Sequence, residues 1–139
     1  MLSTNQAAPS LFLTELDVVR LERLASRAGA PHMAEMLDHV LARATIVPPQ
    51  DIPHDIVTMN SRVTCMLAGE ATPREWTLVY PDSADYDAGR ISVLSPVGGA
   101  LLGVHAGQTV GFQLPDGRAQ QLVVTAIGYQ PEAHGEYTI

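Results

Sequence analysis

The chain has 139 residues and a formal net charge of −7 at pH 7, and 46% of its residues are hydrophobic. This size and composition suit one domain, or one small domain with an appendage, and they exclude a disordered chain. All eight basic residues are scattered arginines, which argues against direct nucleic-acid binding, and no apolar run approaches the roughly 18 residues of a membrane span.

The N-terminal third predicts a flexible tail over residues 1–13 and then two helices. The first predicted helix covers 14–28, where apolar residues recur every three or four positions and Thr14 with Asp17 resembles a capping pair. The second covers 31–44 and begins at Pro31. We expect the two to form a short antiparallel helical hairpin (coiled coil) within residues 14–45, with a reach of about 20 Å.

Three prolines within residues 45–53 predict a linker over 46–53, after which the period of the pattern changes from 3.6 to 2. Residues 54–139 then predict a domain of mostly antiparallel strands with one short helix. The predicted strands cover residues 56–66, 75–80, 91–94, 109–114 and 118–129. The whole chain is therefore predicted to be an α+β protein.

The stretch ISVLSPVGGALLG, residues 91–103, predicts an abrupt corner between a strand and the short helix. Ser95 is a good N-cap and Pro96 a good first helical residue. Gly98 and Gly99 weaken a helix, so we expect them to allow a close approach, either to the sheet or to a partner.

Catalytic and metal-binding patterns are weak. The adjacent residues His54 and Asp55 look like a catalytic pair, but a loop end that satisfies the backbone is the simpler interpretation. The histidines show no metal-ligand spacing, the acids at 82–87 lack a calcium-loop pattern, and neither a P-loop nor a G-x-S-x-G motif occurs. Cys65 is the single cysteine and is interpreted as a small apolar strand residue rather than a reactive thiol. We expect a protein that is not an enzyme and carries no cofactor or metal.

Five blocks together resemble a known family. They are IPHDIVTMNSRV (52–63), WTLVYP (76–81), ISVLSPVGGALLG (91–103), LPDG (114–117) and YQPEAHGEY (129–137). With the short helical segment before them, they are similar to the Rnk family, regulators of nucleoside diphosphate kinase. That family is related to the Gre transcript-cleavage factors, and the resemblance runs from about residue 14 to the C-terminus.

The resemblance implies an FKBP-like domain over residues 54–139 that docks on the β′ subunit of bacterial RNA polymerase, at the rim of the secondary channel. The residues implied to bind the β′ coiled coil are Leu94, Ser95, Pro96, Val97 and Gly98. Leu94 stands where the Gre pattern has an acidic residue, which suggests a more apolar contact here.

The resemblance also bears on catalysis. Gre factors carry two carboxylates at the tip of a long hairpin, whereas the predicted tip here, with candidate residues Ala30, His32 and Glu35, lacks an acid pair. We therefore expect a cytoplasmic, monomeric protein that competes with Gre factors without stimulating cleavage and that affects nucleoside diphosphate kinase levels. The alternatives are a Gre-like cleavage stimulator, a prolyl isomerase by analogy of fold, and a direct protein regulator of that kinase.

Overall fold

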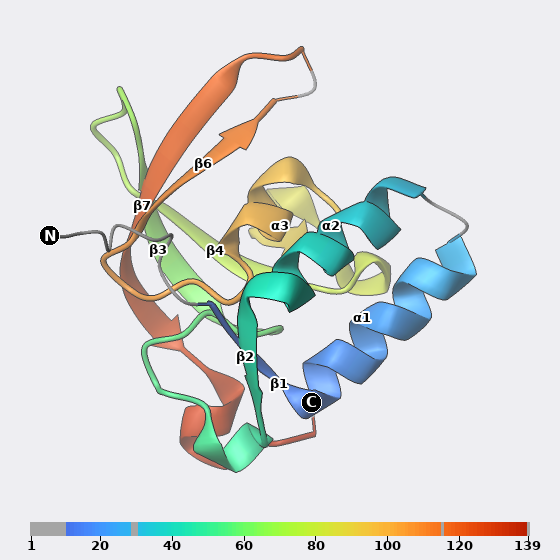
Figure 1. The fold of residues 1–139 in the computed structure, drawn as a ribbon. Coiled ribbons are helices and arrows are strands. Elements are labelled where there is room, and N and C mark those ends of the chain that lie inside the picture. The colour runs from blue at the N-terminus through green and yellow to red at the C-terminus, as the bar shows by residue number, and fades with distance from the viewer. Residues whose placement is uncertain (1–10, 29–30, 115, 139) are drawn as a thin grey trace, which may run out of the picture.

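The N-terminal part of the molecule contains two helices that lie side by side and a pair of short strands (Figure 1). The computed structural model describes residues 11–28, 31–114 and 116–138. The elements are β1 (Leu11–Thr14), α1 (Glu15–Ala28), α2 (Pro31–Arg43) and β2 (Ala44–Val47). Both helices occur where the 3.6-residue period predicts them. Their connection, residues 29 and 30, lies outside the described residues, so the antiparallel hairpin stays a prediction.

Residues 11–13, predicted to belong to a flexible tail, instead form most of β1. This strand pairs in parallel with β2, in a register that joins Leu11 to Ala44. The Phe12 amide also donates a hydrogen bond to the Gly103 carbonyl at 3.2 Å. Leu11 and Leu13 are buried, so this segment is ordered by contacts with residues far away in the sequence, which a local pattern does not reveal.

The rest of the chain forms a curled five-stranded sheet with the strand order β5-β4-β3-β7-β6. Its elements are β3 (Arg62–Leu67), β4 (Arg74–Val79), β5 (Arg90–Ser92), the helix α3 (Pro96–Leu101), β6 (Thr109–Gln113) and β7 (Ala119–Tyr129). Short 3₁₀ turns cover residues 49–51, 81–83, 86–88 and 131–134. The mixed α+β class is confirmed, with one correction: β5 pairs with β4 in parallel, whereas the other pairs in this sheet are antiparallel.

The strand predicted to begin at residue 56 begins only at Arg62. Residues 58–61 form a tight turn instead, in which Ser61 Oγ accepts the Thr58 amide at 2.9 Å and the Thr58 carbonyl accepts the Ser61 amide at 3.0 Å. Asn60 has a φ of 68° within this turn, a left-handed conformation that asparagine tolerates better than most residues. The alternation of apolar residues here reflects burial of both Val57 and Met59, not a strand.

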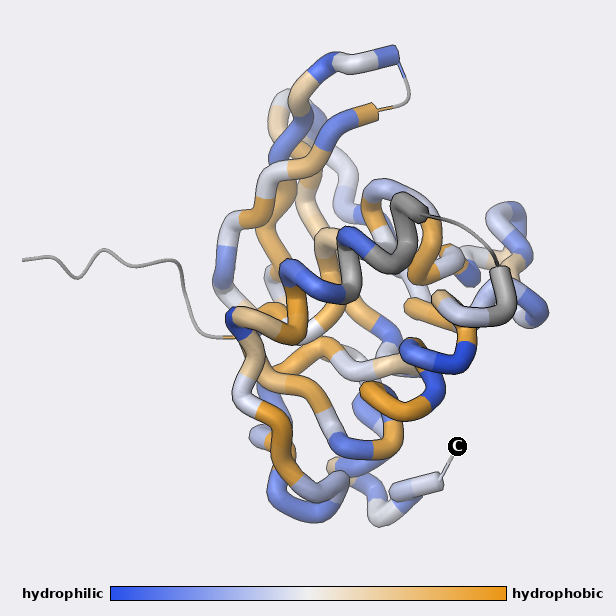
Figure 2. Tube along the Cα trace, turned by 45° about the vertical axis from the view of Figure 1, so that its right-hand side comes forward, coloured by the Kyte–Doolittle hydropathy of each residue, from blue (hydrophilic) through white to orange (hydrophobic). Residues whose placement is uncertain are grey.

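One hydrophobic core joins the two parts of the molecule. Its members include Leu13 and Leu21 from the N-terminal elements and Val63, Leu78 and Leu122 from the sheet. Figure 2 shows apolar stretches along the middle of the molecule and hydrophilic ones mainly at its outside. The proline-rich segment at 46–53 therefore does not separate two cores.

The interpretation of Cys65 as a small apolar strand residue agrees with its position in the core. The side chain is fully buried on β3, and burial raises the pKa of its thiol to about 11. A thiol that stays protonated at neutral pH is a poor nucleophile.

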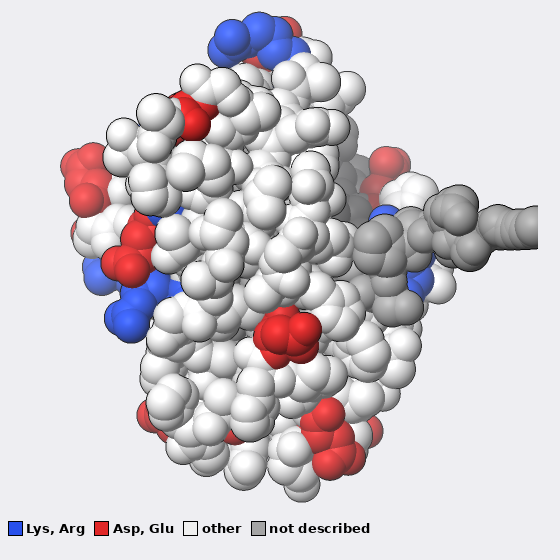
Figure 3. All heavy atoms as spheres, turned by 90° about the vertical axis from the view of Figure 1, so that its left-hand side faces the viewer, with Lys and Arg blue, Asp and Glu red and all other residues white. Residues whose placement is uncertain are grey.

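Uncharged residues cover most of the face drawn in Figure 3. Acidic and basic side chains lie together at its left edge, and separate acidic groups lie among uncharged residues lower down. Among the described residues, no helix is long and apolar enough to cross a membrane.

Candidate functional site

The corner between β5 and α3 is held in one shape by hydrogen bonds from two serines. Ser95 Oγ donates to the Ser92 carbonyl at 2.7 Å and accepts the Gly98 amide at 3.0 Å, as expected of the N-cap of α3. Ser92 Oγ accepts the Leu94 amide at 3.0 Å. Because every one of these bonds is local, the serine and proline pattern was sufficient to predict the corner.

Gly98 lies against the backbone of Ser92 at the end of β5. A Cβ atom placed on Gly98 would lie 2.0 Å from the carbonyl oxygen of Ser92, so only glycine fits at this point of α3. Gly98 is buried, and its close approach is to the end of β5 in the sheet. Its role in the predicted docking set is thus to let α3 pack against the end of β5.

The corner presents two apolar side chains outward. Leu94 is 41% exposed, which is high for leucine, and Pro96 is exposed beside it. Ser95 and Val97 are half-buried, and Val97 packs against the hydrophobic core. Of the predicted docking residues, Leu94 and Pro96 are the ones that a partner would meet first.

The predicted hairpin tip is described only in part. Ala30 lies outside the described residues, as does the side chain of His32 at the start of α2. Glu35 is exposed on α2. Within the described part of the chain, no group of three histidine, cysteine, aspartate or glutamate side chains could hold a metal ion.

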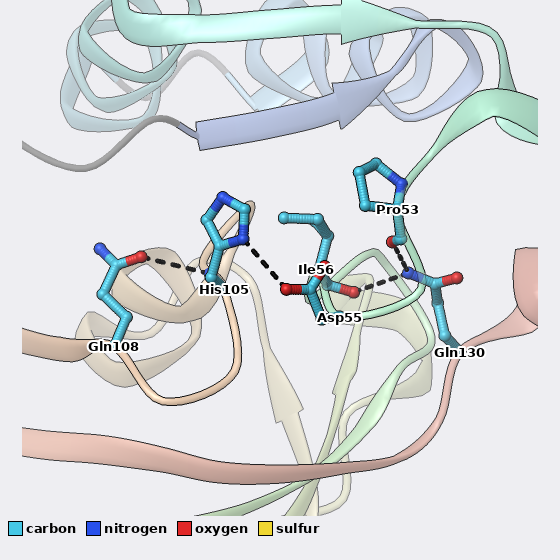
Figure 4. A network of polar contacts seen from close by, with 6 residues as sticks. All are labelled: Pro53, Asp55, Ile56, His105, Gln108 and Gln130. Atoms are coloured by element: carbon cyan, nitrogen blue, oxygen red, sulfur yellow. Dashed lines mark hydrogen bonds and ion pairs between the residues drawn. The ribbon is translucent and has the colours of Figure 1, made fainter.

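Asp55 pairs with a distant histidine instead of its neighbour His54. Its Oδ2 atom lies 3.3 Å from Nδ1 of His105, whose backbone amide donates to Gln108 Oε1 at 3.2 Å (Figure 4). The His105 ring also meets the ring of Phe12 edge-on, with centroids 5.6 Å apart. Through His105, these two contacts join Phe12 of β1 to Asp55, in the loop before the turn at 58–61. The Asp55–His105 pair thus helps to hold these segments together.

The same loop is fixed from its other side by Gln130. The side-chain amide of Gln130 donates to the carbonyls of Pro53 and Ile56, each at 2.8 Å (Figure 4). These backbone carbonyls lie in an irregular segment, and the amide satisfies them where no strand partner does.

A buried polar junction lies where α1 meets the sheet, and the sequence analysis did not find it. Asp17 is 2% exposed and accepts hydrogen bonds from the Met59 amide at 3.2 Å and the Tyr80 hydroxyl at 3.4 Å. Burial raises the pKa of Asp17 to about 7, although the Met59 hydrogen bond opposes that shift. Nearby, Glu132 is nearly buried and accepts the Thr58 hydroxyl at 2.8 Å.

This junction brings together three of the five sequence blocks that carry the family resemblance. Thr58 and Met59 belong to block 52–63, Tyr80 to block 76–81 and Glu132 to block 129–137. The three blocks therefore meet around Asp17 of α1. The signal in the sequence was an aspartate in the first turn of a helix, which we interpreted as part of a capping pair with Thr14.

Comparisons with known proteins identify relatives of this chain. Residues 52–129 match the family described as the C-terminal region of the transcription elongation factors GreA and GreB. A curated protein from Escherichia coli strain K12, named regulator of nucleoside diphosphate kinase, is 40% identical in an alignment of 134 residues. The match covers 94% of this chain and 98% of that protein. GreA of Chlorobium phaeobacteroides is 38% identical over 104 residues, which are 74% of this chain and 63% of that factor.

A solved structure shares the fold. The GreA/GreB elongation factor from Nitrosomonas europaea superposes with a TM-score of 0.72 at 35% sequence identity. The match covers 88% of this chain and all of the other.

Proposed function

The chain belongs to the family of the transcription elongation factors GreA and GreB, and from this premise we propose that it regulates transcription by binding bacterial RNA polymerase at the rim of the secondary channel. The contact surface is the corner at residues 94–97, and its partner is the coiled coil of the β′ subunit.

The observation that carries this proposal is the exposure of Leu94 and Pro96 on a corner that hydrogen bonds hold rigid. A preformed apolar projection binds with little loss of conformational entropy. Burying Leu94 against the side of a coiled coil also removes apolar surface from water, which favours the complex.

The protein would occupy the polymerase without stimulating transcript cleavage. Residues 28–32, which span the end of α1 and the start of α2, include no aspartate or glutamate. Cleavage by a metal-dependent centre needs carboxylates held at defined positions. We therefore propose a non-catalytic competitor of Gre factors, and an influence on nucleoside diphosphate kinase that follows from changed transcription.

The test is binding of the full chain to core RNA polymerase in competition with a labelled Gre factor. We expect the wild-type chain to displace the Gre factor and to leave cleavage of a stalled transcript unstimulated. Pro96→Glu, which places a charge at the apolar corner, should weaken the displacement by tenfold or more. The matched control is Val19→Glu, because Val19 is 44% exposed on α1 and lies outside the corner.

Failure of the wild-type chain to bind core polymerase at micromolar concentrations would contradict the proposal. The next partner to test would then be nucleoside diphosphate kinase itself, because the relative from Escherichia coli is named as a regulator of that enzyme. Equal binding by Pro96→Glu and Val19→Glu would leave the polymerase as partner but would remove the corner as the contact surface.

A further inference from the structure

A cleft of about 530 Å³ lies between α1 and the segment that follows β4. The helix contributes Arg20, Arg23, Leu24 and Ser26. The opposite wall is formed by Tyr80, Pro81 and Asp82. A volume of this size falls in the range of small-molecule sites.

The helical wall of this cleft is a row of hydrogen-bond donors. Arg20, Arg23 and Ser26 follow one another at intervals of three residues, which places them along one face of α1. Two of the eight arginines of an acidic chain therefore lie in one cleft, opposite a single acid, Asp82. This charge distribution favours an anionic ligand.

Arg20 is held in place by the protein. Its guanidinium donates to the Thr138 carbonyl at 2.7 Å and also hydrogen-bonds the Tyr80 side chain. Tyr80 in turn donates to Asp17 in the buried junction. These bonds fix the position of the Arg20 guanidinium, and its positive charge, at the wall of the cleft.

Arg23 is exposed, and its side chain makes no hydrogen bond or ion pair to another residue in the described part of the chain. An arginine that is not engaged by the protein can turn its planar donors toward a phosphate or a carboxylate, which it binds with paired hydrogen bonds. Arg20 would thus supply a fixed positive charge to an anion site, and the Arg23 side chain could change its conformation to contact the anion.

The cleft also offers an apolar contact, because Leu24, Tyr80 and Pro81 line it. We propose that this cleft binds a small organic anion, a phosphate or carboxylate with a flat apolar group attached. The anion lies against Arg20 and Arg23, and the flat group lies against Leu24, Tyr80 and Pro81. This inference does not depend on polymerase binding.

The test is a titration of the full chain, by calorimetry, with four probes that separate the two requirements. They are 1-naphthyl phosphate, 1-naphthoate, neutral 1-naphthol and inorganic phosphate. We expect the two aromatic anions to bind, naphthol and inorganic phosphate to bind at least tenfold more weakly, and the better aromatic anion to identify phosphate or carboxylate as the preferred group.

Arg23→Gln tests the site itself, because Arg23 is exposed and its replacement should leave the fold intact. Loss of one charge-assisted contact should weaken the aromatic anions roughly tenfold. The control is Arg118→Gln, since Arg118 is paired with Asp116 in the turn between β6 and β7 and does not line the cleft. Equal affinity in Arg23→Gln and wild type, equal binding of naphthol and naphthyl phosphate, or no binding at millimolar concentration would each overturn the proposal.

Discussion

The buried carboxyl group of Asp17 makes the stability of the folded protein depend on pH. Its pKa is about 7 in the folded protein against an ordinary value of 3.8, chiefly because its carboxyl group is buried. Between these values the folded state keeps a proton that the unfolded state has lost, so the free energy of unfolding falls as pH rises through this range. The fall is complete above pH 7 and amounts to about 4 kcal/mol if the whole shift is realised.

We therefore expect Asp17→Asn, which stays neutral, to flatten the pH dependence of stability between pH 4 and 7. The amide can still accept the Met59 amide proton, so part of the junction is kept. The measurement is the free energy of unfolding from urea denaturation at several pH values, with the exposed Asp38 changed to Asn as control. Parallel pH profiles for wild type and Asp17→Asn would show that Asp17 does not titrate in this range.

Gly98 supports a second prediction at the residue scale. An alanine there would bring its Cβ against the backbone of Ser92, which cannot turn away as a flexible side chain would. We expect Gly98→Ala to destabilise the protein by roughly 1–3 kcal/mol, as overpacking does. Gly111→Ala is the matched control, because its Cβ would meet its nearest neighbour at 3.8 Å, an ordinary contact.

Thermal unfolding of these two glycine variants provides the comparison. A melting temperature for Gly98→Ala no lower than that of Gly111→Ala would mean that α3 can move off β5 at little cost. In that case the rigidity that we assign to the corner would be wrong as well.

At the scale of elements, the sequence was informative where the contacts are local. The caps at Thr14 and Ser95 each join residues three positions apart, and the structure contains both hydrogen bonds. The two helices and α3 follow from such caps together with the apolar period. The corner of the candidate site is also fixed by local hydrogen bonds, which is why the sequence could predict it in some detail.

Elements that depend on distant partners were missed or misplaced. The strand β1 pairs with β2 some thirty positions later in the chain, and four residues are too few to show a period. The turn at 58–61 was taken for a strand because burial of Val57 and Met59 imitates alternation. Asp17 and Met59 are separated by 42 positions and Asp55 and His105 by 50, so no motif could have joined them.

At the scale of the whole molecule, the shared core decides how the chain unfolds. Leu13 of β1 and Leu21 of α1 pack in the same cluster as Leu78 and Leu122 of the sheet. Removing the N-terminal elements would expose this apolar surface of the sheet. Two modules joined by a linker would unfold separately, whereas one core should unfold in a single cooperative step.

We expect the helical signal from far-ultraviolet circular dichroism and the fluorescence of Trp76 to report the same transition in thermal or urea unfolding. The first follows α1 and α2 mainly, and the second follows β4, where Trp76 is 5% exposed. Leu13→Ala should lower the free energy of unfolding by about 2–5 kcal/mol, and by the same amount in both signals, because it leaves a cavity in the common core. If the helical signal shifted and the tryptophan signal did not, the N-terminal elements would be a separately folding unit, able to move relative to the corner at residues 94–97.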